Sequence, residues 1–265
     1  MSDRLSEFDE LGLRFCDDPV FFAETVLSFS PFSYQAEILR DKAKRVVACL
    51  GRQSGKTATI AVKAIHFAYT NPKTTTLIVS PSLRQSIILF DRILGFIYSN
   101  RVLAASVKRK TRTIIQLSNG SQIIALPCSA HRLRGHTAHM IIVDEAAFVP
   151  DDVVVSILNP MLATTDGVLI LLSTPWGRNH FYKAFMDSDF SVHKVKSSEC
   201  PLISSEFLKK QREFMTKEAY LREYEAEFVE ASTSYFTQDL IQSCIDSSLE
   251  FMDESEIVRE VCLGK

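Results

Sequence analysis

Residues 51–57 form the first stretch whose residue types and spacing could do chemistry. The stretch reads Gly51-Arg-Gln-Ser-Gly-Lys-Thr57, follows a short apolar run and opens a segment with helical spacing. A strand, a glycine-rich loop and Lys-Thr at a helix start are the context of a phosphate-binding loop. The spacing departs from the usual G-x-x-x-x-G-K-[ST] pattern, because Leu50 stands where the first glycine belongs and Gly51 comes one position later. The context still favours a nucleotide site over the alternative, an ordinary turn between a strand and a helix.

Each residue type in this loop suits phosphate binding. Gly55 lets the backbone approach phosphate oxygens, and successive N–H groups with the helix N-terminus attract anions. Lys56 can reach the β and γ phosphates, and Thr57 can offer its hydroxyl to Mg²⁺. We therefore expect ATP and Mg²⁺ as cofactors. The expected nucleotide-binding residues of the loop are Gly51, Arg52, Gln53, Ser54, Gly55, Lys56 and Thr57.

A second apolar run, His139–Phe148, contains the acidic pair Asp144-Glu145. A carboxylate at the end of a buried strand can hold Mg²⁺ through water, and its neighbour can orient and polarise the attacking water. We expect Asp144 to serve the metal together with Thr57, and Glu145 to act in catalysis. An isolated apolar run ending in Asp-Glu is more often a strand end before a solvated turn. The combination with the loop favours hydrolysis of a nucleotide.

The segment Pro31–Gln35 lies upstream of the loop and places the aromatic residue Phe32 before Gln35. A glutamine amide can accept from the adenine amino group and donate to the adjacent ring nitrogen. An aromatic ring can pack on the base. This pair favours ATP over GTP. The alternative is a helix start with a core aromatic residue.

The stretch Leu171–Gly177 ends another apolar run with Ser173-Thr174-Pro175. The ends of such strands lie at the carboxyl edge of an open α/β sheet, where ligands bind. Such hydroxyls can sense the γ-phosphate, and Ser173, Thr174 and Pro175 are the expected coupling or sensor residues. A strand exit with a proline turn is the alternative.

Alternating apolar runs and helical segments must position these motifs. The apolar runs are short and bounded by turn or polar residues, which is typical of parallel strands buried on both faces. They cover residues 45–50, 75–80, 139–143 and 167–173. Helical spacing or helix starts occupy residues 56–70, 82–99 and 151–162. The alternation predicts a three-layer α/β fold of the P-loop NTPase type (ASCE/RecA-like) with a mainly parallel central sheet.

Three further predictions concern elements outside this alternation. Residues 111–127 contain two alternating runs around Ser118-Asn-Gly120, which predicts a β-hairpin at the edge of the sheet. Residues 191–197 could add one more strand. Residues 205–216 and 217–230 have helical character and predict a small C-terminal helical subdomain.

Composition and charge exclude several classes of protein. The chain has 265 residues, of which 46% are hydrophobic and 23% charged, and no apolar run approaches the roughly 20 residues of a membrane helix. Its acidic N-terminus lacks the features of a secretory signal. The six cysteines show no C-x-x-C spacing, so we expect reduced thiols rather than a zinc site. These features predict a globular protein of the cytoplasm.

The formal net charge of −2 means that any contact with DNA must be local. The densest basic run is Val107–Arg112, and its candidate DNA-binding residues are Lys108, Arg109, Lys110 and Arg112. Such a run can contact phosphates without sequence preference. A solvated strand edge that deters strand pairing explains the same residues and is favoured.

These motifs, in this order, resemble those of the ATPase half of viral large terminase subunits, the DNA-packaging motors of tailed bacteriophages. The resemblance is carried by Pro31–Gln35, Gly51–Thr57, Ile141–Ala146 and Ser173–Pro175. In that family an arginine and a glutamine commonly precede the x-G-K-[ST] core, as Arg52 and Gln53 do. The stretches Leu133–His136 and Tyr220–Phe228 also look like the family, and the resemblance covers roughly residues 30–236.

The resemblance implies a Mg²⁺-dependent ATPase that drives double-stranded viral DNA into a procapsid through the portal. The implied partners are double-stranded DNA, the portal protein, the small terminase subunit and further copies of the chain. These copies would form a homo-oligomeric ring, expected to be a pentamer, although the isolated chain could be a monomer. The implied location is the host cell cytoplasm, transiently at the portal vertex, without a membrane.

Family terminases also carry a C-terminal nuclease domain of the ribonuclease-H type. The chain after Phe236 is too short for that domain, so we expect no nuclease activity from this chain alone. The expected division is a P-loop ATPase core with an N-terminal adenine-binding segment at residues 1–200, and a helical lid or linker at residues 201–265. That linker would lead to the missing nuclease domain.

The resemblance also suggests arginine fingers, which spread charge in a phosphoryl-transfer transition state. Arg134 is the candidate for action on a neighbouring subunit, with Arg132 and Arg84 as further candidates. Arg52 could act within its own subunit or sense the nucleotide. The alternative for each is a surface or carboxylate-paired arginine.

Two other functions stay open at this point. A superfamily 2 helicase-like DNA-dependent ATPase would share Gln35, the loop and the acidic pair, but it would require a second RecA-like domain. A non-enzymatic portal-binding assembly module would retain the nucleotide fold without hydrolysis.

Overall fold

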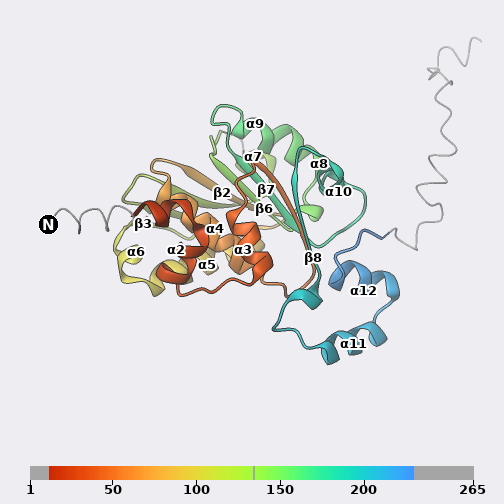
Figure 1. The fold of residues 1–265 in the computed structure, drawn as a ribbon. Coiled ribbons are helices and arrows are strands. Elements are labelled where there is room, and N and C mark those ends of the chain that lie inside the picture. Colours follow the sequence, from red (N-terminus) through yellow and green to blue (C-terminus); the bar gives the residue numbers. More distant parts are fainter. Residues whose placement is uncertain (1–11, 134, 230–265) are drawn as a thin grey trace, which may run out of the picture. The chain divides into compact units, whose positions relative to one another are not determined.

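A twisted, mainly parallel β-sheet forms the centre of the molecule (Figure 1). The computed structural model describes residues 12–133 and 135–229, and in this part of the chain the sheet has eight strands in the order β3-β4-β5-β2-β6-β7-β1-β8. The pairs β3-β4 and β4-β5 are antiparallel, and the other neighbouring strands of this sheet pair in parallel. The strands are β1 Arg45–Leu50, β2 Thr75–Ser80, β3 Val107–Lys110, β4 Ile114–Leu117, β5 Gln122–Pro127, β6 Met140–Asp144, β7 Val168–Ser173 and β8 Ser191–Val195.

Helices cover both faces of this sheet. The α-helices are α2 Pro19–Val26, α3 Ser33–Arg40, α4 Lys56–Thr70, α5 Leu83–Ser99, α6 Arg101–Ala105, α7 Ala130–Leu133, α8 Asp151–Val153, α9 Asn159–Leu162, α10 His180–Met186, α11 Ser205–Phe214 and α12 Lys217–Tyr224. A π-helical stretch, Val154–Leu158, joins α8 to α9. Among the described residues, no helix has the length and apolar character needed to cross a bilayer.

Alternate residues of the strands pack into two apolar cores, one on each face. On β1, Val46 and Ala48 join the core beneath α2 to α5. Val47 and Cys49 join the other core, with the helices that follow β6 and β7. This is the consequence of side chains alternating across a strand. The predicted three-layer α/β fold is therefore confirmed.

Strand β7 lies between β1 and β6 and pairs in parallel with both. Its residue Ser173 is level with Cys49, near the end of β1, and Leu172 is level with Asp144, at the end of β6. A strand between the loop strand and the acidic strand is the arrangement of the ASCE class. It brings the ends of all three strands to one edge of the sheet.

The predicted hairpin is confirmed, since β4 and β5 pair antiparallel. The outer edge, however, is β3, which pairs with β4 and contains three residues of the basic run. The side chains of Lys108, Arg109 and Lys110 are exposed there. Charged residues on an edge strand discourage pairing with other chains.

The helix predicted at residues 217–230 is shorter than expected and ends at Tyr224. Ala226 adopts a left-handed backbone conformation with φ 53°, which stops the helix. Phe228 then packs against the rings of Phe181, Tyr182 and Phe185. The free energy gained by packing this ring exceeds that of one more helical turn.

Helices α11 and α12 enclose a small apolar cluster of their own, built on Leu208, Tyr220 and Tyr224. They belong to the same unit, Met1–Val229, as the sheet. The division at residue 200 stays a prediction, and residues 230–265 lie outside the described residues.

The end of α12 meets the loop after β1 at Gly51. The N–H of Arg52 donates to the carbonyl of Glu223 at 2.7 Å, and the N–H of Gly51 donates to the carbonyl of Val195 at 2.9 Å. A Cβ on Gly51 would lie 2.5 Å from the Oγ of Ser197 and 2.8 Å from the carbonyl oxygen of Tyr224. Only glycine allows this approach.

We expect Gly51→Ala to lower the free energy of unfolding by about 1–3 kcal/mol, the usual cost of overpacking. The matched control is Gly95→Ala, because Gly95 lies exposed in α5 with open space around an added Cβ. That variant should gain about 0.5–1 kcal/mol. Urea unfolding followed by circular dichroism measures both, and equal midpoints for the two variants would contradict the packing argument.

Candidate nucleotide-binding site

A cavity of about 680 Å³ opens at the carboxyl edge of the sheet, which is a size typical of small-molecule sites. It brings together predicted residues from three separate segments and others that the sequence did not indicate. The predicted residues in its lining are Arg52, Gln53, Gly55, Lys56, Thr57, Glu145 and Thr174. The others are Ala58, Gln85, Arg92 and Phe148.

The loop after β1 holds its shape through its own backbone. Gln53 and Gly55 adopt left-handed conformations with φ 60° and 76°, and a Cβ at Gly55 would collide with the side-chain amide of Gln35. The buried hydroxyl of Ser54 donates to the carbonyl of Gly51 at 2.7 Å. The loop is thus closed before α4 begins at Lys56.

Helix α3 supports the loop from behind. The hydroxyl of Tyr34 donates to the carbonyl of Ser54 at 2.9 Å, and the Nε2 of Gln35 approaches the same oxygen at 3.4 Å. The Oε1 of Gln35 accepts from the N–H of Phe32 at 2.9 Å. Both ends of the Gln35 amide are therefore engaged with protein groups.

Neither Phe32 nor Gln35, both described residues, lines the cavity, so their adenine-binding role stays a prediction. Tyr34 was not among the residues expected at the site. Its hydroxyl was a possible signal, because a buried tyrosine needs a hydrogen-bond partner.

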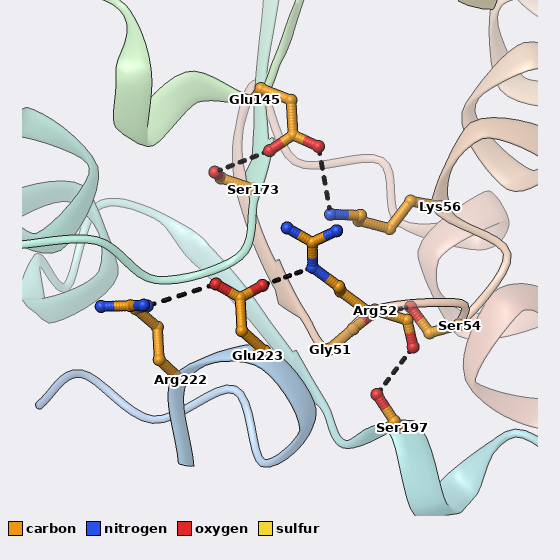
Figure 2. Close-up of polar contacts among 9 residues, drawn as sticks. All are labelled: Gly51, Arg52, Ser54, Lys56, Glu145, Ser173, Ser197, Arg222 and Glu223. Carbon is orange, nitrogen blue, oxygen red and sulfur yellow. Dashed lines mark hydrogen bonds and ion pairs between the residues drawn. The ribbon is translucent and has the colours of Figure 1, made fainter. Parts of the chain in front are cut away.

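Lys56 and Glu145 face each other across the site (Figure 2). The Nζ of Lys56 lies 3.5 Å from the Oε1 of Glu145, and the hydroxyl of Ser173 lies 3.5 Å from the other carboxylate oxygen. The side chains of Lys56 and Glu145 are 13% and 30% exposed, so both charged groups are accessible from the cavity.

The backbone of Glu145 is strained, with φ 52° and ψ 46° in the left-handed region. Such a conformation in a residue other than glycine costs about 1–3 kcal/mol and persists only where the surroundings hold it. It turns the chain sharply at the end of β6. The carboxylate is thereby aimed at the loop rather than along the strand.

Asp144 is the last residue of β6 and accepts from the N–H of Glu145 at 3.1 Å. Burial raises the pKa of its carboxyl to about 6, and the charge of Glu145 adds to the rise, while the charge of Lys56 opposes it. A divalent cation would favour the ionised form.

Thr57 lines the cavity and Asp144 ends β6, and a hydroxyl and a carboxylate are oxygen donors of the kind that suits Mg²⁺. This ion usually takes one or two protein ligands and completes its shell with substrate phosphates and water. Within the described residues, no group of three or more His, Cys, Asp or Glu side chains is placed to hold a metal ion. The donor set therefore fits a metal that arrives with a nucleotide.

Arg52 is paired with a carboxylate from α12. Its Nε lies 2.5 Å from the Oε2 of Glu223, whose Oε1 lies 3.3 Å from the Nε of Arg222 (Figure 2). The hydrogen bond to Glu223 raises the pKa of the Arg52 guanidinium. Arg222 in turn stacks over the ring of Trp176 at 4.2 Å. From the sequence, Glu223 was indicated only as part of the stretch Tyr220–Phe228, which resembles the family.

None of the other candidate arginines among the described residues lines the cavity. Arg134 lies outside the described residues. Arg132 in α7 and Arg84 in α5 are exposed and do not line the cavity. The cavity is instead lined by Arg92 of α5, whose guanidinium lies over the ring of Phe96 at 4.8 Å. No motif surrounds Arg92 in the sequence.

Comparison with known proteins gives consistent results. A family model described as "Terminase large subunit, T4likevirus-type, N-terminal" matches residues 47–243. The large terminase subunit of Thermus virus P23-45 is 29% identical over 249 residues, covering 80% of this chain and 51% of that protein. The chain thus spans about half the length of the curated relatives it matches.

Two solved structures extend the comparison. The large terminase ATPase domain of Thermus phage P74-26 is 27% identical, with a TM-score of 0.72, and the match covers 80% of this chain and 99% of that domain. The large terminase of bacteriophage HK97 shares the fold at 15% identity, with a TM-score of 0.66 over 80% of this chain and 55% of that one.

The family match covers most of the chain and includes the loop, the acidic pair and the strand-end hydroxyls. The cavity at the edge of the sheet is built from these same motifs. The chain therefore belongs to the terminase large subunit family of the T4likevirus type, whose N-terminal region it matches.

Proposed function

We propose that this chain is an ATPase subunit that hydrolyses ATP with Mg²⁺ to drive double-stranded viral DNA through a portal into a procapsid. The observation that carries the proposal is the 3.5 Å approach of Lys56 to Glu145 at a cavity edged by a glycine-rich loop. Membership of the terminase family supports the link to DNA packaging.

The geometry suggests how nucleotide binding would bring the site into its catalytic arrangement. The phosphates of ATP would lie on the N–H groups of the loop and at the N-terminus of α4. They would then replace Glu145 as the partner of Lys56. The freed Glu145 carboxylate could orient the attacking water, a task in phosphoryl transfer that requires an acceptor beside the γ-phosphate.

Mg²⁺, held by Thr57 and Asp144, would neutralise charge on the β and γ phosphates. Ser173 and Thr174 are the groups through which the state of the γ-phosphate would reach β7, since Thr174 lines the cavity and Ser173 contacts Glu145. Pro175 follows them at the turn. This set is proposed as the coupling segment.

Adenine recognition is assigned to Phe32 and Gln35. Gln35 contacts the carbonyl of Ser54 and the N–H of Phe32, and its amide has a second N–H and a second acceptor lone pair that could meet the base. Its contact with Ser54 would link base binding to the loop.

The two arginine assignments rest on different grounds, Arg52 on its place at the cavity and Arg134 on the family resemblance alone. Arg52 lines the cavity but is held by Glu223, so it would have to leave that partner to reach the γ-phosphate of its own subunit. Arg134 is proposed to act on the neighbouring subunit. The ring, expected to be a pentamer, would act at the portal vertex in the host cytoplasm with the portal protein and small terminase subunit. Double-stranded DNA would meet the basic edge strand β3 weakly.

We expect Glu145→Gln to bind ATP with nearly unchanged affinity and to lose turnover by at least about 100-fold, the usual contribution of a general base. Lys56→Ala should lose both binding and turnover, because the phosphates lose their cation. Phosphate release and binding of a fluorescent ATP analogue measure the two quantities. Full turnover by Glu145→Gln would refute the assigned mechanism and leave a non-enzymatic assembly module as the better description.

Arg52 and Glu223 form a matched pair for testing the arginine within the loop. If Arg52 acts on the γ-phosphate, Arg52→Ala should lower kcat by about 1,000-fold, whereas Glu223→Gln should lower it by less than about 10-fold. Both variants remove the same ion pair. Steady-state kinetics measure kcat for both variants, and melting temperatures show whether the loss of the ion pair destabilises them equally. Equal kcat values for the two variants would assign Arg52 a purely structural role.

Action across subunits predicts complementation. Arg134→Ala and Glu145→Gln should each be inactive alone, yet a mixture should regain ATPase activity, because an Arg134→Ala subunit keeps its own Glu145 and receives an arginine from its neighbour. Arg101→Ala serves as the surface control, because Arg101 is exposed in α6 and does not line the cavity. The rate per subunit of the unmodified protein should also rise steeply with concentration. A flat rate, with no recovery in the mixture, would indicate a self-contained site.

A further inference from the structure

Asn179 joins the segment after β7 to the segment after β6. Its Oδ1 accepts from the N–H groups of Phe181 and Tyr182 at 3.0 and 3.4 Å, which caps helix α10. Its Nδ2 donates to the carbonyl of Ala147 at 2.6 Å and to that of Trp176 at 3.1 Å. One amide therefore satisfies four backbone groups in two separate chain segments.

The carbonyl of Ala147 belongs to the turn that begins at Glu145. The N–H of Phe148 donates to the carbonyl of Glu145 at 3.0 Å, and the N–H of Val149 donates to that of Ala146, also at 3.0 Å. These bonds form a single 3-10 turn, Ala146–Phe148. The turn starts from the left-handed backbone of Glu145, which must be held by its surroundings.

Two other contacts join the same segments. The N–H of His180 donates to the Oδ1 of Asp151 at 3.2 Å, and the Nδ1 of His180 lies 3.0 Å from that same oxygen. The rings of Phe148 and Trp176 stack with centroids 5.3 Å apart. Of the three connections, the one from Asn179 is nearest in sequence to Glu145.

We propose that Asn179 is a positioning residue for Glu145. Its Nδ2 bond to the carbonyl of Ala147 holds the 3-10 turn against α10 and thereby keeps the Glu145 carboxylate between Lys56 and Ser173. The inference rests on the proposed ATPase function, because it assigns Asn179 an effect on the step that Glu145 performs. A loss of this bond lets the strained turn relax and moves the carboxylate.

Asn100 offers a matched control elsewhere in the fold. It caps α6 through Oδ1, which accepts from the N–H groups of Val102 and Leu103 at 2.9 and 3.1 Å. Its Nδ2 donates to the carbonyl of Val26 at 2.9 Å. The pattern of bonds resembles that of Asn179, which donates in addition to Trp176. None of these partners of Asn100 belongs to the turn that begins at Glu145.

The test is Asn179→Asp against Asn100→Asp in the full chain. Aspartate is as good an N-cap as asparagine, so both variants keep the helix cap. Both lose the Nδ2 donor and place a carboxylate oxygen against the distant carbonyl. We expect Asn179→Asp to lower kcat by about 10- to 100-fold, the scale of a small misplacement of a catalytic group, with KM for ATP within about 2-fold. Asn100→Asp should keep kcat within about 2-fold, at a comparable loss of melting temperature.

A kcat for Asn179→Asp equal to that of Asn100→Asp would overturn the proposal. Asn179→Ser, which keeps one acceptor and places no second oxygen against Ala147, carries the same test if Asn179→Asp does not fold. Unmodified protein and Glu145→Gln are measured alongside. If neither the unmodified protein nor Glu145→Gln hydrolyses ATP, the proposed function fails. If the unmodified protein hydrolyses ATP, Glu145→Gln does not, and the Asn179 variants have the kcat of the unmodified protein, then the positioning role alone fails.

Discussion

The parallel pairing of β7 with both β1 and β6 is the constraint on which the site depends. Because β7 lies level with the ends of both neighbours, the glycine-rich loop, the acidic pair and the strand-end hydroxyls emerge at one edge. A shift of one residue in a strand would turn its side chains to the other face and separate Lys56 from Glu145. The two apolar cores prevent such a shift, since alternate residues of each strand are buried on opposite faces.

The loop itself is shaped by what lies behind it. Helix α3 fixes the carbonyl of Ser54 through Tyr34, and the end of α12 lies against Gly51 so closely that a side chain would not fit. This explains the displaced glycine of the motif. At position 50 the structure needs a buried apolar residue at the end of β1, and Leu50 is 2% exposed. At position 51 it needs the absence of a side chain, because a Cβ there would collide with Ser197 and with the carbonyl oxygen of Tyr224 at the end of α12.

The strands, the loop, the acidic pair and the hairpin could be predicted because each is encoded locally, by periodicity or by turn residues. The sequence could not predict contacts that depend on distant side chains. Glu223 lies 171 residues from Arg52 along the chain, and Asn179 lies 32 residues from Ala147, so no local pattern connects either pair. The end of α12 was misplaced for a similar reason, since its stop at Tyr224 allows Phe228 to reach the rings of α10. Gln35 had a plausible local role, yet its amide is engaged by the loop, which only the tertiary structure brings near.

The Arg52 side chain can leave Glu223 at a low cost in free energy. Arg52 is 64% exposed while Glu223 is 12% exposed, and ion pairs with such an exposed partner contribute little, commonly about 0–1 kcal/mol. Breaking the pair would normally leave a largely buried carboxylate without a cation, which is costly. Glu223 avoids that cost because Arg222 remains beside its other oxygen. The Arg52 side chain can therefore leave Glu223 at low cost, while α12 keeps its contact with the loop through the bond from the N–H of Arg52 to the carbonyl of Glu223. In the proposed ATPase this side chain would be available to a phosphate, because the backbone, and not the ion pair, holds the end of α12 at the loop.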